Sequence, residues 1–176
     1  GDGDSRTLRN TGDRPARITL TTRGVPRVAP EAGGYGFGIT RRYFDMEGNR
    51  VDPATVEAGT RLVTVLRVTP FEKAESRLII DDPLPAGLEI DNPNLLRSGD
   101  IASLGWLDPA SARHSEFRSD RFIAAVDWRK AEPFELAYIV RAVTPGRYHH
   151  PAATVEDMYR PRYHARTGTG RIEVTR

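Results

Sequence analysis

The sequence predicts an all-β protein that folds as an antiparallel β-sandwich, with at most short helical turns. Apolar and polar residues alternate with a period of two along much of the chain, and no amphipathic pattern is long enough for a core helix. Thirteen Pro and sixteen Gly divide the chain into short runs. Short strands separated by turns are typical of an antiparallel sandwich.

Each alternating run is predicted to form one strand, because side chains two residues apart on a strand share a face. In chain order the predicted strands are residues 18–21, Phe37–Asp45, Leu62–Val68, Ser76–Asp82, Phe122–Trp128, Leu136–Ala142 and Arg171–Thr175. In the third run, Leu62 and Leu66 lie opposite Val63 and Val65, so both faces of that strand are apolar.

Turns are predicted where polar residues, Gly and Pro interrupt the runs. The segment Asp45–Asn49 is typical of a hairpin turn after its strand. The segment Leu84–Ile90 predicts a corner that leads into a further strand, because Pro85 presets φ and Gly87 accepts a positive φ.

Two short helical turns are also expected. Asp52 is a candidate cap for a turn over Pro53–Glu57, with Pro at the first helical position, and a similar pattern marks Asp108–Arg113. The stretch 92–112 is expected to be the longest loop.

The segment Val25–Gly38 holds two Pro and four Gly with few aliphatic residues, which predicts a linker. We therefore expect residues 1–36 to be the tail of a preceding domain with its linker, and residues 37–176 to form a C-terminal sandwich domain. Since the chain opens at Gly1 without Met, we expect it to be a piece of a longer protein.

Composition excludes several functional classes. Lys and Arg total 26 against 24 Asp and Glu, and the basic residues are interleaved with apolar and acidic ones, which argues against a nucleic-acid partner. The chain contains no Cys, so it has no disulfide, thiolate metal site or Cys nucleophile. No run is long enough to span a membrane, so direct membrane insertion by this chain is not expected.

No catalytic, metal or cofactor site is predicted. The glycines of residues 33–38 lack the Lys of a Walker loop and the third Gly of a dinucleotide fingerprint, and a strand follows them. His149 and His150 are adjacent, so on a strand they point to opposite faces and cannot share a metal. The adjacent acidic pairs form no acid/base dyad on one face. We expect no enzymatic activity and no cofactor.

The segment Val155–Pro161 is the most specific feature left. Met158, Tyr159 and Arg160 are large side chains in a loop stopped by Pro161, where Gly, Ser or Asn are more usual. From the residues alone two interpretations stand: Met158 and Tyr159 fill the core of their own domain, or they serve a surface outside it.

Four segments, taken together, resemble the C-terminal macroglobulin-like domain (MG10 type) of bacterial alpha-2-macroglobulins. They are Asp82–Pro93, Asp120–Ala125, Ala137–Gly146 and Pro151–Pro161, and their order and spacing match. The similarity covers Gly38 to Arg176, and residues 10–12 and the strand before residues 24–26 resemble the chain just upstream, returning from the thioester domain. The resemblance implies a sandwich of macroglobulin or fibronectin-like type.

The resemblance also implies a function. Proteins of this family are protease traps of the bacterial cell envelope, in which cleavage of a bait region exposes a thioester carried by another domain. In relatives the Met-Tyr-Arg-Pro loop covers that thioester, which maps the shield onto Met158, Tyr159, Arg160 and Pro161. Expected partners are the thioester domain of the same parent chain and, through the whole protein, target proteases. The expected location is the periplasm, with an inner-membrane anchor in the missing N-terminal part.

Two structural expectations follow for this loop. Without its partner domain, Met158 and Tyr159 should be partly exposed or mobile, and burial of both would favour the core interpretation. Arg160 should pair with a carboxylate across the interface, or locally with Glu156 or Asp157.

A second functional hypothesis is an adhesion or carbohydrate-binding sandwich. Trp106, Trp128 and Tyr163 would then form a platform for a sugar. Trp128 counts against it, because it alternates in step with Val126 and so shares that core-like face.

Overall fold

The structure of the chain is a computed structural model that describes residues 7–19, 21, 28–72, 75–91, 114–118 and 120–176. Within these residues the chain forms fourteen strands and no helix. The all-β prediction is confirmed. Among the described residues, no helix has the length and hydrophobicity that crossing a bilayer requires.

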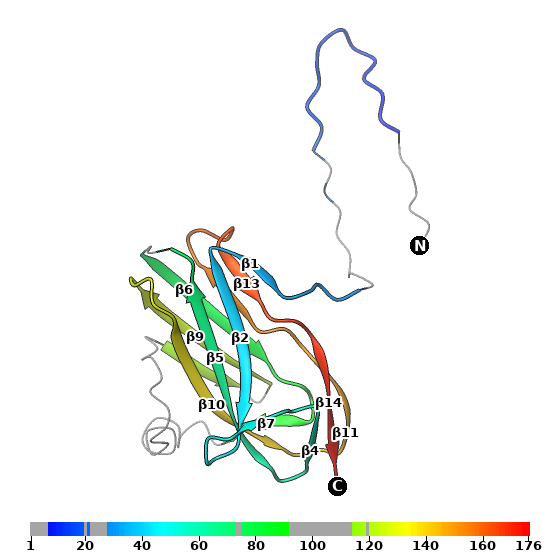
Figure 1. Cartoon of the computed structure of the whole chain (residues 1–176). Helices are drawn as coiled ribbons and strands as arrows, with labels where there is room; N and C mark the ends of the chain where they lie inside the picture. The colour runs from blue at the N-terminus through cyan, green and yellow to red at the C-terminus, as the bar shows by residue number, and fades with distance from the viewer. Residues whose placement is uncertain (1–6, 20, 22–27, 73–74, 92–113, 119) are drawn as a thin grey trace.

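The strands form three sheets (Figure 1). The six-stranded sheet has the order β1 (Gly33–Tyr35), β13 (His164–Arg166), β12 (Thr154–Asp157), β6 (Ser76–Pro83), β9 (Arg121–Trp128) and β8 (His114–Arg118). The five-stranded sheet has the order β3 (Arg50–Val51), β2 (Phe37–Phe44), β5 (Arg61–Pro70), β10 (Phe134–Ala142) and β7 (Leu88–Ile90). The three-stranded sheet has the order β11 (Gly146–His150), β14 (Gly170–Thr175) and β4 (Thr55–Glu57).

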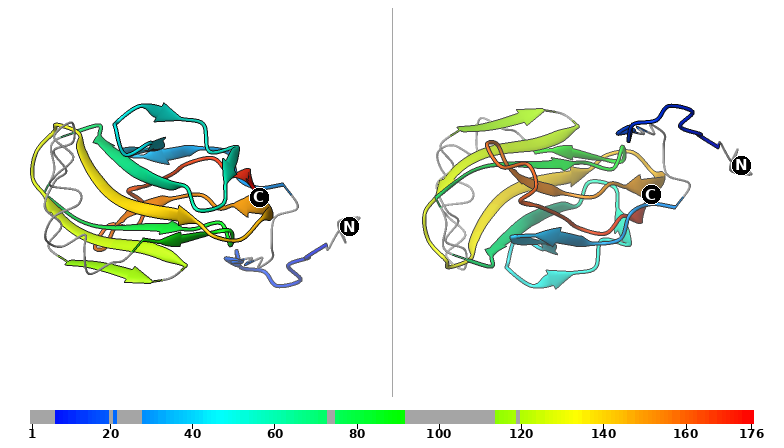
Figure 2. Two further views of the ribbon diagram at one scale, coloured as in Figure 1. Left: turned by 90° about the horizontal axis from the view of Figure 1, so that it is seen from below. Right: turned by 90° about the horizontal axis from the view of Figure 1, so that it is seen from above.

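The two larger sheets lie face to face as a sandwich, which the end-on views of Figure 2 show. Pairings between the named strands are antiparallel, except that β4 and β14 run parallel. Consecutive strands such as β5 and β6 belong to opposite sheets, so the chain crosses the sandwich repeatedly. The predicted antiparallel sandwich is therefore confirmed, with one parallel pair added.

Inward-facing residues from both sheets form one hydrophobic core. On β5, Leu62 and Leu66 point into this core, while Val63 and Val65 lie on the other face in a separate small cluster with Ile139. The prediction that this strand is apolar on both faces is confirmed. Each fully buried aliphatic side chain of this kind contributes about 1.5–3 kcal/mol to folding.

One inward position of β2 is charged. Arg41 forms an ion pair with Asp82 of β6, and its Nη2 also donates to the backbone oxygen of Pro151 at 2.7 Å. The hydroxyl of Tyr138 on β10 donates to the second oxygen of Asp82 at 2.6 Å. Burial raises the pKa of Asp82, and the positive charge of Arg41 acts against that shift. This group links β6 of one sheet to β2 and β10 of the other.

The long predicted strands all appear, with bounds that differ by a residue or two. The runs that start at residues 37, 62, 76, 122, 136 and 171 correspond to β2, β5, β6, β9, β10 and β14. The hairpin turn is confirmed: the amide of Asp45 donates to the oxygen of Asn49 at 2.9 Å, and Gly48 has a φ of 91°. The corner at Leu84–Ile90 leads into β7, as predicted, but Gly87 does not have a positive φ; a Cβ there would instead lie 2.3 Å from Cε2 of Tyr148.

The helical turn expected at Pro53–Glu57 is wrong. Asp52 does accept a hydrogen bond from the amide of Ala54 at 3.0 Å, as a cap would. Beyond it the chain extends into β4, which pairs with β14 and buries Val56 in the core. Tertiary pairing overrides the local capping signal. The second expected turn, Asp108–Arg113, and the long loop at 92–112 lie outside the described residues.

The strand expected at residues 18–21 is also wrong for its described residues. Residues 18, 19 and 21 are assigned to no strand, and the Ile18 side chain is exposed. An alternating pattern forms a strand only where a neighbouring strand can pair with it. Conversely, Gly33–Tyr35 within the expected linker forms β1 and pairs with β13.

Candidate functional site

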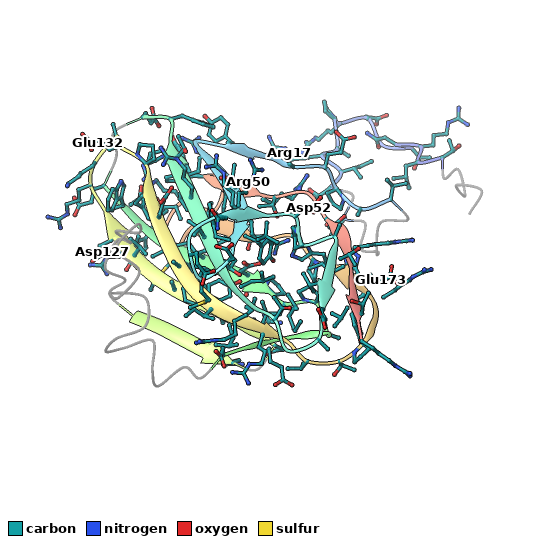
Figure 3. The ribbon with its side chains drawn as sticks, turned by 60° about the horizontal axis from the view of Figure 1, so that its bottom comes forward. Arg17, Arg50, Asp52, Asp127, Glu132 and Glu173 are labelled. Carbon is teal, nitrogen blue, oxygen red and sulfur yellow. The ribbon has the colours of Figure 1, made fainter. Side chains whose placement is uncertain are left out.

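The loop from Met158 to Tyr163 joins β12 to β13 at one end of the sandwich. The start of β6 lies at the same end (Figure 1), where Glu75 and Ser76 accept hydrogen bonds from Arg160. Arg77 of β6 forms an ion pair with Asp127 at 3.6 Å, and Figure 3 shows Asp127 and Glu132 at the end of the molecule opposite Glu173. The loop thus lies where β12 ends and where β13 and β6 begin.

Met158 and Tyr159 are exposed on this loop. Their side chains retain 55% and 71% of their accessible surface, so neither fills the core of the sandwich. The expectation of partial exposure is confirmed, and the core interpretation is wrong. Covering these exposed apolar side chains with a second protein surface would lower the free energy, because it removes apolar area from water.

Asp157 holds the backbone of the loop. It is the last residue of β12, and its side chain is buried with 2% exposed. Its Oδ1 accepts hydrogen bonds from the amides of Tyr159 at 3.0 Å and Arg160 at 3.1 Å. A carboxylate that accepts two successive amides fixes the direction in which the chain turns.

Arg160 joins the loop to β6. Its Nε and Nη2 donate to Oδ2 of Asp157 at 3.0 and 2.7 Å, which is the local pairing expected from the sequence. Nη2 also donates to the backbone oxygen of Glu75 and to Oγ of Ser76, both at 3.0 Å. Charge-assisted bonds of this kind are roughly twice as strong as neutral ones.

Tyr163 packs against the loop through its aromatic ring. Its ring centre lies 4.7 Å from the guanidinium carbon of Arg160 and 5.1 Å from that of Arg162, so two cations contact the ring. A Cβ at Gly36 would lie only 2.1 Å from Cδ1 of Tyr163, and Gly36 has a φ of 76°. Only Gly at position 36 lets the chain pass this ring.

Arg77 contacts the exposed ring of the site. Its guanidinium carbon lies 5.7 Å from the centre of the Tyr159 ring, and its Nη1 donates to the Tyr159 hydroxyl at 3.3 Å. A hollow of about 310 Å³ lies between them, lined by Glu75, Arg77, Asp157, Tyr159 and Arg160. The Tyr159 ring therefore contacts the charged Arg77 on one side and is otherwise largely exposed to solvent.

The charges at this site are stable near neutral pH. Burial alone would raise the pKa of Asp157, but bonds from the Arg160 side chain and the two backbone amides outweigh it, so the pKa lies below its ordinary value. The bond to Asp157 raises the pKa of Arg160. Both groups are charged at neutral pH, and neither is poised to transfer a proton.

His149 and His150 lie away from this loop, on β11. His149 is exposed and His150 is buried, on opposite faces of β11 as predicted. His150 shares a hydrogen bond of 2.8 Å with the Tyr43 hydroxyl, and burial, helped by the positive charge of Arg41, lowers its pKa to about 3. A cavity of about 740 Å³ opens beside it, lined in part by Arg50 and Asp52, which Figure 3 labels.

The sugar platform of the second hypothesis finds no support in its described residues. Trp128 packs against Phe134 with ring centres 4.5 Å apart, and its indole nitrogen donates to the backbone oxygen of Glu132 at 3.0 Å. The Tyr163 ring is in contact with two guanidinium groups. Trp106 lies outside the described residues.

Sequence reasoning did not single out Ser76 or Arg77 as part of the site. Both come from β6, more than eighty residues before the loop, and no local pattern links them to it. The pairing of Asp157 with Arg160 did carry a local signal, because opposite charges three residues apart can meet across a tight turn.

Fold and site together define a β-sandwich module whose distinctive feature is a loop with two exposed apolar side chains, anchored by Asp157 and Arg160. The model of the family described as "Bacterial Alpha-2-macroglobulin MG10 domain" matches residues 36–162. This chain belongs to that family. The resemblance inferred from the sequence motifs is confirmed.

Individual relatives agree with the family match. The chain is 37% identical over 169 residues to an alpha-2-macroglobulin of Xylella fastidiosa, an alignment that covers 92% of this chain and 10% of that protein. It is 34% identical over 165 residues to the alpha-2-macroglobulin of Escherichia coli, covering 89% of this chain and 10% of the relative. The chain thus spans about a tenth of the length of these relatives.

Solved structures show the same sandwich. Native Escherichia coli alpha-2-macroglobulin, from domain MG7 to the C-terminus, matches with a TM-score of 0.75 and 32% identity, covering 87% of this chain and 25% of that one. Salmonella alpha-2-macroglobulin reacted with methylamine matches with a TM-score of 0.75 and 34% identity, covering 87% and 10%.

Proposed function

We propose that this chain is the C-terminal domain of a bacterial alpha-2-macroglobulin that traps proteases, and that its loop Met158–Pro161 shields a thioester carried by another domain until the trap is activated. The observation that carries the proposal is the exposure of Met158 and Tyr159 on a loop anchored by Asp157 and Arg160. The domain itself has no catalytic role in this proposal. It contains no Cys and cannot supply the thioester.

The chemistry of the two exposed side chains suits a shield. A thioester is an activated acyl group that water and amines attack, so its lifetime depends on excluding them. An aromatic ring and a flexible thioether cover such a group with apolar surface that adapts to its shape.

The surroundings of the loop also suit contact with a second domain. Tyr35 and Phe71 are 56% and 66% exposed. Tyr35 packs against Tyr163 beneath the loop, and the amide of Phe71 donates to the oxygen of Gly36 at 3.0 Å. Large apolar side chains therefore gather at this end of the sandwich, as they do where proteins meet.

The remaining elements of the proposal concern the parent protein. Residues 37–176 are the C-terminal sandwich domain and residues 1–36 the tail of the preceding domain with its linker, whose last residues pair with the sandwich through β1. The partners are the thioester domain of the same parent chain and, through the whole protein, the proteases it captures. The parent acts in the periplasm, anchored to the inner membrane by its N-terminal part.

The decisive experiment replaces Tyr159 with Gly in the full-length parent protein. Without the ring, water and amines reach the thioester, so methylamine should open it at least about tenfold faster, a lost shielding free energy of roughly 1.4 kcal/mol. The rate is followed as thiol released per mole of protein. Tyr159→Phe is the matched control, because it keeps the ring and removes only the hydroxyl, and it should react at nearly the wild-type rate.

An unchanged rate in Tyr159→Gly would contradict the shield. Equal acceleration in Tyr159→Gly and Tyr159→Phe would show that the hydroxyl and its bond to Arg77, not the apolar cover, protect the bond.

A further inference from the structure

We propose that Asp157 and Arg160 are positioning residues of the shield: they lock the loop so that Met158 and Tyr159 stand in place before any partner domain is present. This inference rests on the proposed shielding function and assigns a separate task within it. Met158 and Tyr159 cover the reactive bond, whereas Asp157 and Arg160 act only through them.

The first step of the argument is that the acceptor sites of Asp157 are taken up by the loop itself. One oxygen accepts the amides of Tyr159 and Arg160, and the other accepts Nε and Nη2 of Arg160. The amide of Asp157 donates to the oxygen of Tyr163 at 3.0 Å, and the amide of Tyr163 donates to the oxygen of Arg160 at 2.8 Å. Every one of these bonds joins residues within the turn, so the turn has an internal frame.

The second step is that this frame is fastened to the sheet. Nη2 of Arg160 reaches Ser76 and the backbone of Glu75, and the amide of Met158 donates to the backbone oxygen of Arg77 at 2.8 Å. The Arg160 guanidinium also stacks on Tyr163. The loop is therefore tied to β6 through its backbone and through Arg160, without use of the Met158 or Tyr159 side chains.

The third step is that the two exposed side chains are carried by the frame and not part of it. The amides of Met158 and Tyr159 are bonded to Arg77 and Asp157, whereas the exposed Tyr159 side chain contacts Arg77 through its ring and hydroxyl. A surface that is ordered before docking loses less conformational entropy when it docks. The frame thus keeps the apolar side chains available at low entropic cost.

Asp157→Asn in the full-length parent tests the inference. Asn keeps nearly the volume of Asp and one oxygen for the backbone amides, but its NH₂ group faces the donors of Arg160 and breaks that pair. We expect methylamine to open the thioester about three- to tenfold faster than in wild type, less than in Tyr159→Gly, because the ring is present but held for less of the time. Amide hydrogen exchange of the peptide covering residues 157–163 should accelerate in parallel.

Two further variants keep the test sharp. Arg160→Lys keeps a positive charge but loses the planar guanidinium. Because Asp157 is unchanged in this variant, faster thioester opening and faster amide exchange would come from losing the Asp157–Arg160 pair. Glu156→Gln is the matched control, since Glu156 is an exposed acid on the neighbouring position of β12, and it should leave both measurements unchanged.

The outcomes separate the two proposals. If Tyr159→Gly accelerates the reaction while Asp157→Asn and Arg160→Lys do not, the shield stands and the positioning role is overturned. If amide exchange accelerates in both variants but the rate of thioester opening does not, the frame orders the loop without serving the shield, which also overturns the inference. If Tyr159→Gly itself has no effect, the shielding function fails, and the positioning role fails with it.

Discussion

Two Arg–Asp pairs in this domain use the same chemistry for different ends. Arg41 and Asp82 lie 41 residues apart in the chain, with side chains only 5% and 0% exposed, and join the two sheets of the sandwich. Arg160 and Asp157 lie three residues apart, and the Arg160 side chain is 38% exposed. The first pair fixes how the sheets meet, whereas the second fixes one turn. Burial and sequence separation, not the pair itself, decide what an ion pair contributes.

The largest effect should come from breaking the buried pair. Asp82→Ala leaves the Arg41 charge and the Tyr138 hydroxyl inside the core without their acceptor, so the free energy of unfolding should fall by about 3–5 kcal/mol. Chemical denaturation of the chain measures this. Asp81→Ala is the control, because Asp81 is its partly exposed neighbour and pairs with Arg121 at 3.2 Å, and it should cost about 1 kcal/mol or less. Equal losses in the two variants would show that burial does not set the difference.

A smaller effect tests the same core through pH. His150 is excluded from protonation in the folded state down to a pKa of about 3, whereas in the unfolded chain it titrates near 6.5. Below that unfolded pKa the unfolded state binds a proton that the folded state does not, so stability falls as the pH falls, by roughly 1.4 kcal/mol for each pH unit.

The histidine pair supplies its own control. His150→Gln should remove this part of the pH dependence between pH 6.5 and 4, while His149→Gln on the exposed face of β11 should keep it. Unfolding curves measured across that range compare the slopes, and parallel slopes for wild type and His150→Gln would rule out the buried neutral imidazole.

The smallest effect on global stability belongs to the loop pair. Arg160→Ala removes a partly exposed pair between residues three apart, so the free energy of unfolding should fall by only about 1 kcal/mol or less. The same denaturation experiment measures it beside Asp82→Ala. A loss as large as that of Asp82→Ala would mean that the loop supports the whole sandwich, and the distinction between the two pairs would disappear.

The two pairs also show what can be predicted from sequence. The strands from residues 37 to 142 that alternate cleanly were predicted because a buried face leaves a period-two pattern. The pairing of Asp157 with Arg160 could also be predicted, because the two residues are only three apart in the chain. The partners of Arg41 and of Ser76 were not, because contacts over 41 and 84 residues depend on how sheets pack.

Local signals also misled where packing competed with them. Asp52 and Pro53 signal a helix start, yet Val56 gains more by entering the core beside β14. The exposure of Met158 and Tyr159 was anticipated through the family resemblance, because hydrophobicity alone favours burying both. A hydrophobicity pattern assigns large apolar side chains to the core of their own domain, so it wrongly predicts burial for those that contact another domain.

The internal frame of the loop has a consequence for protein engineering. Because its bonds run almost wholly between Asp157 and Tyr163, the turn is a compact cassette that carries most of its own instructions for folding. A host hairpin would need to offer a hydroxyl and two backbone carbonyls on the adjacent strand, as Ser76, Glu75 and Arg77 do here, and room for the Tyr163 ring. Grafted in this way, the seven-residue insert would display a chosen pair of side chains at a defined height above a sheet.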